Sequence, residues 1–227
     1  MTASSISGDG MKRMRVAILI SGRGSNMAAL IEAAKDKNFP AEIVLVLSNR
    51  PDAAGLSFAS AAGVATVVID HKIYGKDRAA FDGAMQAVLE QHRVELLCLA
   101  GFMRLLTDGF VNRWEGRMIN IHPALLPAFK GLDTHQRALE AGAKLHGATV
   151  HFVVPEMDGG PIIMQGAVAV RAGDSAQTLA ARVLAVEHQI YPQALKLVAE
   201  GRVRIVDGRC LVDGKPVPDA TSLVPSA

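Results

Sequence analysis

The strongest constraint on the fold comes from two short runs of almost wholly apolar residues, at positions 14–20 and 96–100. Runs of this length without polar alternation are typical of strands that are buried on both faces, as in parallel sheets covered by helices. Between these runs, apolar residues recur at helical spacing, most clearly over 77–92. The alternation predicts an α/β fold with a mostly parallel twisted sheet flanked by helices.

The C-terminal part departs from this alternation. Strands predicted at 149–154 and 162–170 are separated only by a short loop rich in Gly and Pro, which predicts an antiparallel hairpin. A long helix should follow, capped by Asp174 with Gln177 in the capping-box position. Further strands are expected at 43–47, 65–69, 118–122, 203–206 and 210–212, and further helices at 27–34, 53–62 and 134–141. We therefore expect antiparallel strands in the C-terminal part of the fold.

The length of 227 residues and the mass of 24.0 kDa allow one substantial core, so a single domain is expected over 14–216. Residues 1–13 are rich in Ser and Gly and lack the apolar run of a signal peptide. They are predicted to form a disordered N-terminal extension. Residues 217–227 are predicted to form a loose C-terminal tail.

Charge and cysteine content narrow the class of protein. The 24 basic and 22 acidic side chains nearly cancel, leaving a formal net charge of +2, and aromatic residues make up only 4% of the chain. This composition favours neither nucleic acid nor an anionic membrane as a partner. Cys98 and Cys210 have no second Cys or His at metal-ligand spacing. Free thiols, no metal and a cytoplasmic location are therefore expected.

A glycine-rich segment, 21–26 (Ser-Gly-Arg-Gly-Ser-Asn), joins the first apolar run to the following helix. A loop in this position places backbone N–H groups and a helix N-terminus around an anion, most simply a phosphate. The dinucleotide fingerprint is incomplete, because Met27 replaces its third glycine and 48–50 (Ser-Asn-Arg) lacks the acidic ribose ligand. The segment favours one phosphorylated substrate over NAD, with a simple turn as the alternative.

Three polar side chains carry the strongest chemical signal. Asn120 and His122 alternate at the end of a predicted strand that Pro123 terminates, so both point to the same face. Asp158 lies in a tight loop, 155–161, after another predicted strand. An amide donor, an imidazole and a carboxylate can stabilise an oxyanion and move a proton during acyl transfer. Each could instead serve only structure, since Asp before two glycines is also ordinary turn chemistry.

The other candidate residues are less distinctive. Among the seven histidines, His151 is the second candidate for a functional role after His122, because its strand leads to Asp158. His135 is the third candidate. No Ser or Cys is paired with a base, so a substrate nucleophile is expected to attack directly. The segment 101–106 (Gly-Phe-Met-Arg-Leu-Leu) is unusually apolar for a loop. It suits a flat aromatic ligand with an acidic tail, and a hydrophobic plug is the alternative.

Four motifs occur together in one order along the chain. They are Ser21-Gly22-x-Gly24-Ser25-Asn26, Leu99-Ala100-Gly101-Phe102-Met103-Arg104, Asn120-Ile121-His122-Pro123 and Asp158-Gly159-Gly160-Pro161. Over 14–216 the sequence closely resembles the phosphoribosylglycinamide formyltransferase family of folate-dependent enzymes. The resemblance implies a Rossmann-like formyltransferase fold. It also implies formyl transfer from 10-formyltetrahydrofolate to the amine of N1-(5-phospho-D-ribosyl)glycinamide (glycinamide ribonucleotide) in purine (IMP) biosynthesis.

The resemblance further implies roles for particular residues. Asn120 and His122 would stabilise the oxyanion, and Asp158 would support the protonated form of His122. The phosphate and ribose of the amine substrate would be bound by Gly24, Ser25, Asn26 and Glu187. The folate would be bound by Arg78, Met103, Arg104, Leu105, Leu106, Asn120, Val154, Met157 and Asp158. The implied partners are these two small molecules, and a homodimer is left open.

Two related enzymes and one other class of protein are the alternatives. Formyltetrahydrofolate deformylase would add an N-terminal regulatory domain, and methionyl-tRNA formyltransferase a C-terminal tRNA-binding domain. The length is expected to leave room for neither. A non-catalytic nucleotide-binding module would leave the coincidence of Asn120, His122 and Asp158 unexplained. Asp133 is left out of the implied site, because some relatives carry His there.

Overall fold

The computed structural model describes residues 12–216. The predictions for residues 1–11 and 217–227 lie outside the described residues. Arg13, expected to belong to the N-terminal extension, is held against the domain instead. Its guanidinium donates hydrogen bonds to the backbone carbonyls of Ala34, Phe39 and Ala41. The folded domain therefore includes Arg13.

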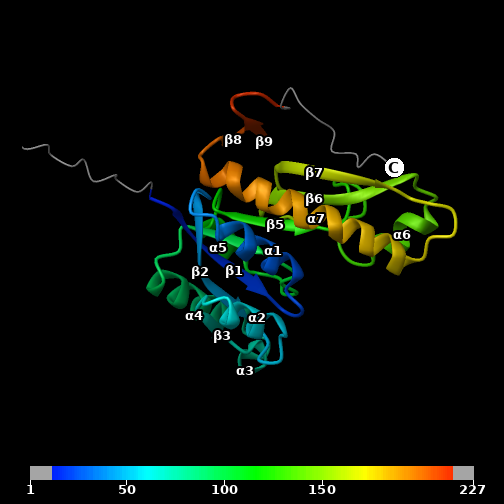
Figure 1. Ribbon diagram of the computed structural model, residues 1–227. Helices are drawn as coiled ribbons and strands as arrows, with labels where there is room; N and C mark the ends of the chain where they lie inside the picture. The colour runs from blue at the N-terminus through cyan, green and yellow to red at the C-terminus, as the bar shows by residue number, and fades with distance from the viewer. Residues whose placement is uncertain (1–11, 217–227) are drawn as a thin grey trace, which may run out of the picture.

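A seven-stranded sheet forms the centre of the molecule (Figure 1). Its strands are β1 (Met14–Ile20), β2 (Ala41–Ser48), β3 (Thr66–Val68), β4 (Leu96–Leu99), β5 (Met118–His122), β6 (Leu145–Phe152) and β7 (Ile162–Ala169). They lie in the order β3-β2-β1-β4-β5-β6-β7. The first five pair in parallel, whereas β6 pairs antiparallel with β5 and with β7. The predicted fold class is confirmed.

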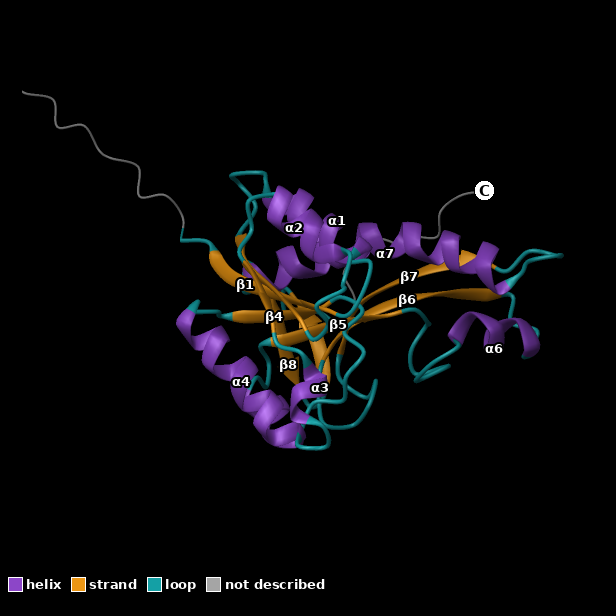
Figure 2. Cartoon of the chain, turned by 90° about the horizontal axis from the view of Figure 1, so that it is seen from below, coloured by secondary structure: helices purple, strands orange, loops and turns teal. Residues whose placement is uncertain are grey.

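Helices cover both faces of the sheet (Figure 2). One face carries α1 (Ser25–Ala34), α2 (Gly55–Ala61) and α7 (Ala176–Ala199), and the other carries α4 (Arg78–Gln91) and α5 (Asp108–Arg113). Along β1, Val16, Ile18 and Ile20 pack into the first core, whereas Ala17 and Leu19 pack into the second. Because successive strand residues face opposite layers, both sets must be apolar. The short helices α3 (His71–Tyr74) and α6 (Thr134–Glu140) and a hairpin of β8 (Val203–Val206) and β9 (Arg209–Val212) complete the fold.

The structure adds two short helices that the sequence pattern did not predict, α3 and α5. Asp70 caps α3 by accepting a hydrogen bond from the backbone N–H of Lys72, and Thr107 caps α5 in the same way. Helices this short bury too few side chains to show a period of 3.6 residues. Their caps are therefore the only local signal of their position.

Two further predictions were wrong in detail. β6 begins at Leu145 rather than at residue 149, and the segment contains Gly147, which weakens a strand prediction. A Cβ at Gly147 would lie 1.9 Å from the carbonyl oxygen of Gly166 on β7, so glycine is required where the strands approach. The cap of α7 is a box formed by Ser175 and Thr178, because the Asp174 carboxylate binds Arg182 instead.

The strand order places several loops at one edge of the sheet. The chain moves outward from β1 to β3 and then returns to add β4 on the other side of β1. In open α/β sheets, the carboxyl ends of the strands at such a reversal form the crevice where ligands bind. The glycine-rich segment, the apolar segment 101–106 and the residues after His122 all leave the sheet from this edge. Within residues 12–216, no helix has the length and apolarity needed to span a lipid bilayer.

Candidate active site

The C-terminal end of β5 presents two of the predicted catalytic residues. The strand ends at His122, immediately before Pro123. In the antiparallel register with β6, Asn120 lies opposite His151 and His122 lies opposite Thr149. Both histidines are buried. The register therefore brings His151, the second candidate among the histidines, beside Asn120.

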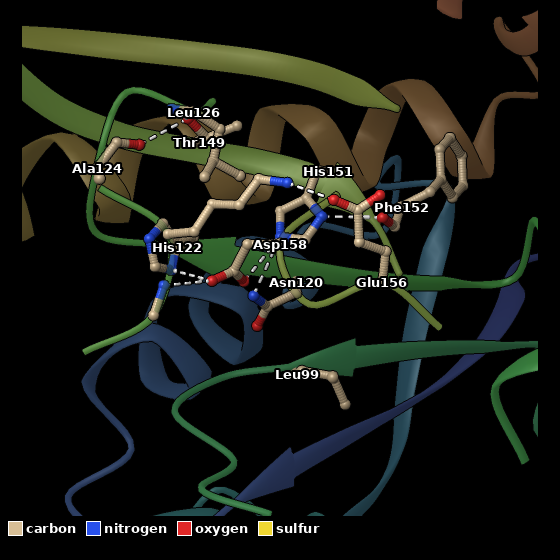
Figure 3. A network of polar contacts seen from close by, with 12 residues as sticks. Leu99, Asn120, His122, Ala124, Leu126, Thr149, His151, Phe152, Glu156 and Asp158 are labelled. Carbon is tan, nitrogen blue, oxygen red and sulfur yellow. Dashed lines mark hydrogen bonds and ion pairs between the residues drawn. The ribbon is translucent and has the colours of Figure 1, made fainter. Parts of the chain in front are cut away.

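His122 lies between two oxygen atoms. Its Nδ1 is 3.4 Å from Oδ2 of Asp158 (Figure 3). Its Nε2 is 3.0 Å from the backbone carbonyl oxygen of Phe129. The same Asp158 oxygen accepts a hydrogen bond of 2.8 Å from the N–H of Gly131. Both ring nitrogens of His122 therefore face hydrogen-bond acceptors.

The Asn120 side chain is oriented by His151. Asn120 Nδ2 lies 3.2 Å from His151 Nε2, and His151 Nδ1 lies 2.8 Å from the carbonyl oxygen of Phe152. Burial lowers the pKa of His151, so its ring is neutral at pH 7. Nδ1 then donates to Phe152, and Nε2 accepts from the Asn120 amide. This leaves the second amide hydrogen of Asn120 available to a ligand.

The loop after His122 is fixed by a residue that the sequence analysis did not single out. The hydroxyl of Thr149, which is fully buried, donates to the carbonyl oxygen of Ala124 at 2.7 Å and accepts from the N–H of Leu126 at 3.0 Å. Gln165 also donates to this hydroxyl, at 2.9 Å. A Thr inside a predicted strand has no special signal, because its partners come from a separate loop. Thr149 thus fixes the backbone of Ala124 and Leu126, in the loop that follows His122.

The glycine-rich loop approaches α2 closely. Gly24 has a φ of 73°, and a Cβ there would lie 3.1 Å from Cα of Gly55. Ser25 begins α1, and no side chain caps the N-terminus of this helix, so its first backbone N–H groups lack a side-chain acceptor. Met27 is fully buried in the space that a third glycine would leave open in a dinucleotide site.

The structure brings together two predicted substrate residues from opposite ends of the chain. Asn26 Nδ2 donates a hydrogen bond of 2.5 Å to Oε2 of Glu187 on α7. Glu187 is 7% exposed, and this burial raises the pKa of its carboxyl group. A buried carboxylate next to an amide can accept hydrogen bonds from ligand hydroxyl groups.

Apart from Asn120 on β5, the residues expected to bind folate lie in two loops and at one helix end. Met103 and Leu105 expose about two thirds of their surface, at 67% and 64%, and Met157 exposes 56%. Leu106 packs on the core below, and the guanidinium of Arg104 lies 5.9 Å from the ring centre of Phe81. Arg78 is exposed at the first position of α4, and Val154 is half-buried. Exposed apolar side chains of this size suit contact with a ligand ring.

Other nucleophile and histidine candidates lie outside this cluster. Burial raises the pKa of the Cys98 thiol to about 12, so this thiol remains protonated and unreactive. His135 packs edge-on against the ring of His146, with 5.2 Å between ring centres. His146 in turn contacts the ring of Phe129. These contacts indicate packing roles for His135 and His146.

The fold and the cluster define an α/β protein with an amide, an imidazole and a carboxylate at the carboxyl edge of its sheet, groups that can stabilise an oxyanion and move a proton. The sequence profile of the formyl transferase family matches residues 14–195. Phosphoribosylglycinamide formyltransferase of Escherichia coli (strain K12) is 42% identical over 205 residues, covering 90% of this chain and 96% of that protein. The chain therefore belongs to the phosphoribosylglycinamide formyltransferase family, a family of formyl-transferring enzymes.

Two further comparisons agree with this assignment. The solved structure of phosphoribosylglycinamide formyltransferase from Coxiella burnetii superposes with a TM-score of 0.85 at 42% identity, covering 91% of this chain and 97% of that one. Trifunctional purine biosynthetic protein adenosine-3 of Bos taurus is 52% identical over 194 residues, or 86% of this chain. This chain spans only 19% of the length of that trifunctional relative.

Proposed function

We propose that this protein transfers a formyl group from 10-formyltetrahydrofolate to the amine of N1-(5-phospho-D-ribosyl)glycinamide, as a step of purine (IMP) biosynthesis. The observation that carries the proposal is the 3.4 Å approach of His122 Nδ1 to Asp158 Oδ2 beside the Asn120 amide. Relatives named for phosphoribosylglycinamide formyl transfer and purine biosynthesis support the choice of substrates. The contacts within the cluster support the roles of its residues.

The proposed reaction is a direct transfer. The neutral amine attacks the formyl carbon, a C–N bond forms, and negative charge develops on the formyl oxygen of the tetrahedral adduct. When this adduct collapses, the bond between the formyl carbon and N10 of the folate breaks, and the proton lost by the amine passes to N10 to give tetrahydrofolate. Before the collapse, the free amide hydrogen of Asn120 and the protonated His122 donate hydrogen bonds to the formyl oxygen, and the negative charge of Asp158 stabilises the imidazolium. A covalent enzyme intermediate is unnecessary, since the buried Cys98 thiol stays protonated.

The proposed binding sites follow from the two loops at the sheet edge. The phosphate of the amine substrate binds the backbone N–H groups of Gly24, Ser25 and Asn26, and its ribose hydroxyls bind Glu187. The pterin of the folate lies against Met103, Arg104, Leu105 and Leu106 and is covered by Val154 and Met157. Arg78 binds the acidic tail of the folate. The exposed apolar surface of Met103, Leu105 and Met157 supports this arrangement.

The experiment that tests the function is incubation of the purified protein with 10-formyltetrahydrofolate, with and without glycinamide ribonucleotide. We expect folate consumption only when the amine is present, together with one formylated amine per folate consumed, measured by mass spectrometry. Folate consumption without the amine would instead establish a hydrolase. Binding of both compounds without consumption would establish a non-catalytic module. The same mixture without the protein serves as the control for non-enzymatic transfer.

A further inference from the structure

Ser21 connects the two loops that the proposed function assigns to different substrates. It follows β1 and opens the glycine-rich loop. Its backbone N–H donates to the carbonyl oxygen of Gly101 at 3.1 Å, and its Oγ accepts from the N–H of Met103 at 2.7 Å. Gly101 and Met103 belong to the apolar loop after β4. Ser21, in the glycine-rich loop (21–26), thus makes two hydrogen bonds to the apolar loop at 101–107, which is called the folate-side loop below.

The direction of the Ser21 hydroxyl is fixed by Asn49. The hydroxyl hydrogen is donated to Oδ1 of Asn49 at 2.6 Å, which leaves the oxygen lone pairs for the N–H of Met103. Both side chains are buried, with 6% of Ser21 and 2% of Asn49 exposed. Asn49 follows β2, so the network spans the ends of three neighbouring strands, β2, β1 and β4. Buried polar networks with every member paired are rigid.

The far end of the folate-side loop is also held. Oδ2 of Asp82 on α4 accepts two hydrogen bonds of 2.7 Å from Thr107, one from its N–H and one from its hydroxyl. Between these two anchors, the side chains of Met103 and Leu105 remain exposed. The loop backbone is therefore fixed while its apolar side chains face outward. Only the Ser21 anchor reaches across to the glycine-rich loop.

We propose that Ser21 is a positioning residue that sets the folate-binding loop relative to the phosphate-binding loop, so that the two substrates are held at reacting distance. This inference rests on the proposed function. Loss of the Ser21 hydroxyl should weaken folate binding first, because the hydrogen bond from the Met103 N–H to Ser21 Oγ orients the backbone of Met103. The glycine-rich loop keeps Gly24, Ser25 and Asn26 when Ser21 is changed, so binding of the amine substrate should be preserved.

A matched control variant distinguishes the positioning role of the Ser21 hydroxyl from a purely structural role. Ser48 is fully buried at the end of β2, and its hydroxyl pairs with the backbone N–H and carbonyl groups of Arg50, at 3.0 and 2.8 Å. Ser48→Ala therefore removes a comparable buried hydroxyl without touching the folate-side loop. Loss of stability alone would affect both variants in the same way.

The test is steady-state kinetics of formyl transfer for the wild-type protein, Ser21→Ala and Ser48→Ala, with both substrates varied. For Ser21→Ala we expect the KM for 10-formyltetrahydrofolate to rise about tenfold, as for loss of one hydrogen bond that leaves a partner unpaired. The KM for glycinamide ribonucleotide should stay within about twofold of wild type. Equal folate KM values for Ser21→Ala and Ser48→Ala would overturn the inference.

A second variant covers the case in which Ser21→Ala does not fold. Ser21→Cys keeps nearly the same shape but supplies a weak acceptor, and we expect its folate KM to rise in the same direction. A folded Ser21→Cys variant with the wild-type folate KM would refute the positioning role. Failure of the proposed function is distinguishable, because the wild-type protein itself would then transfer no formyl group to glycinamide ribonucleotide.

Discussion

His122 Nδ1 lies 3.4 Å from Oδ2 of Asp158, although one residue ends β5 and the other lies in the loop between β6 and β7. The contact depends on the antiparallel pairing of β5 with β6, which returns the chain to the same edge of the sheet. Asp158 adopts a φ of 51°, which Asp tolerates better than most residues. Turn chemistry and the proposed catalytic role thus coincide at this position.

Replacing Asp158 with Asn should lower kcat by about 10²-fold, because the imidazolium of His122 loses the negative charge that stabilises it. Circular dichroism should show an intact fold, since an amide oxygen can still accept from Gly131. Glu156→Gln is the matched control. Glu156 lies in the same loop but is exposed and pairs with Lys130. Equal kcat values for the two variants would remove Asp158 from the mechanism.

His151 should act through Asn120. His151→Phe removes the acceptor that orients the Asn120 amide, and we expect kcat to fall about tenfold with little change in either KM. In a protein that already carries Asn120→Ala, the same change should have almost no further effect on kcat. A double-mutant cycle measures this coupling. Fully additive effects of the two substitutions would show that His151 acts independently of Asn120.

Glu187→Gln should weaken binding of the amine substrate alone. The amide can still pair with Asn26, but it is a poorer acceptor for ribose hydroxyls than a carboxylate, whose hydrogen bonds are about twice as strong. We expect the KM for glycinamide ribonucleotide to rise about tenfold and the folate KM to remain unchanged. Initial-rate kinetics with each substrate varied will measure both values. A rise confined to the folate KM would place Glu187 on the other side of the site.

The buried, neutral imidazole of His146 should make the stability of the fold decrease in mild acid. It is 1% exposed, and burial lowers its pKa from an ordinary value near 6.5 to about 4. As the pH falls from about 6.5 to 4, the His146 imidazole binds a proton in the unfolded chain but not in the folded chain. The free energy of unfolding therefore falls by about 2–3 kcal/mol. His135, His151 and His188 also have lowered pKa values and act in the same direction.

Urea unfolding at pH 7 and pH 4.5 measures this effect in the wild-type protein and in His146→Phe. This substitution keeps an aromatic ring beside those of Phe129 and His135, and the phenyl ring cannot be protonated. We expect the variant to lose less stability than the wild type between the two pH values. An equal loss in both proteins would assign the acid sensitivity to other groups.

Much of the fold and part of the site could be predicted from short-range patterns. The apolar runs predicted the parallel strands, and Pro123 marked the end of β5. The glycine-rich segment marked the start of α1 because backbone conformation there is set by local residues. These signals are local, since they depend on periodicity, on proline and on glycine.

The remaining features depend on pairings between distant segments. The contact of Asn26 with Glu187 requires α7 to return across α1. The contact of Asn120 with His151 requires one particular register of β6, and a slip of one residue would turn His151 away. The role of Thr149 depends on a loop that folds back to it. Local residue patterns contain no information about such distances.

The central claim is that the imidazole of His122 supplies a hydrogen bond to the formyl oxygen in the transition state. The most direct test is kcat/KM for formyl transfer by His122→Ala, compared with His135→Ala, a nearby histidine that packs against His146. We predict that His122→Ala loses about 10²–10³-fold in activity and keeps a cooperative unfolding transition, while His135→Ala stays within about threefold of wild type. Near-native turnover by a folded His122→Ala variant would contradict the claim.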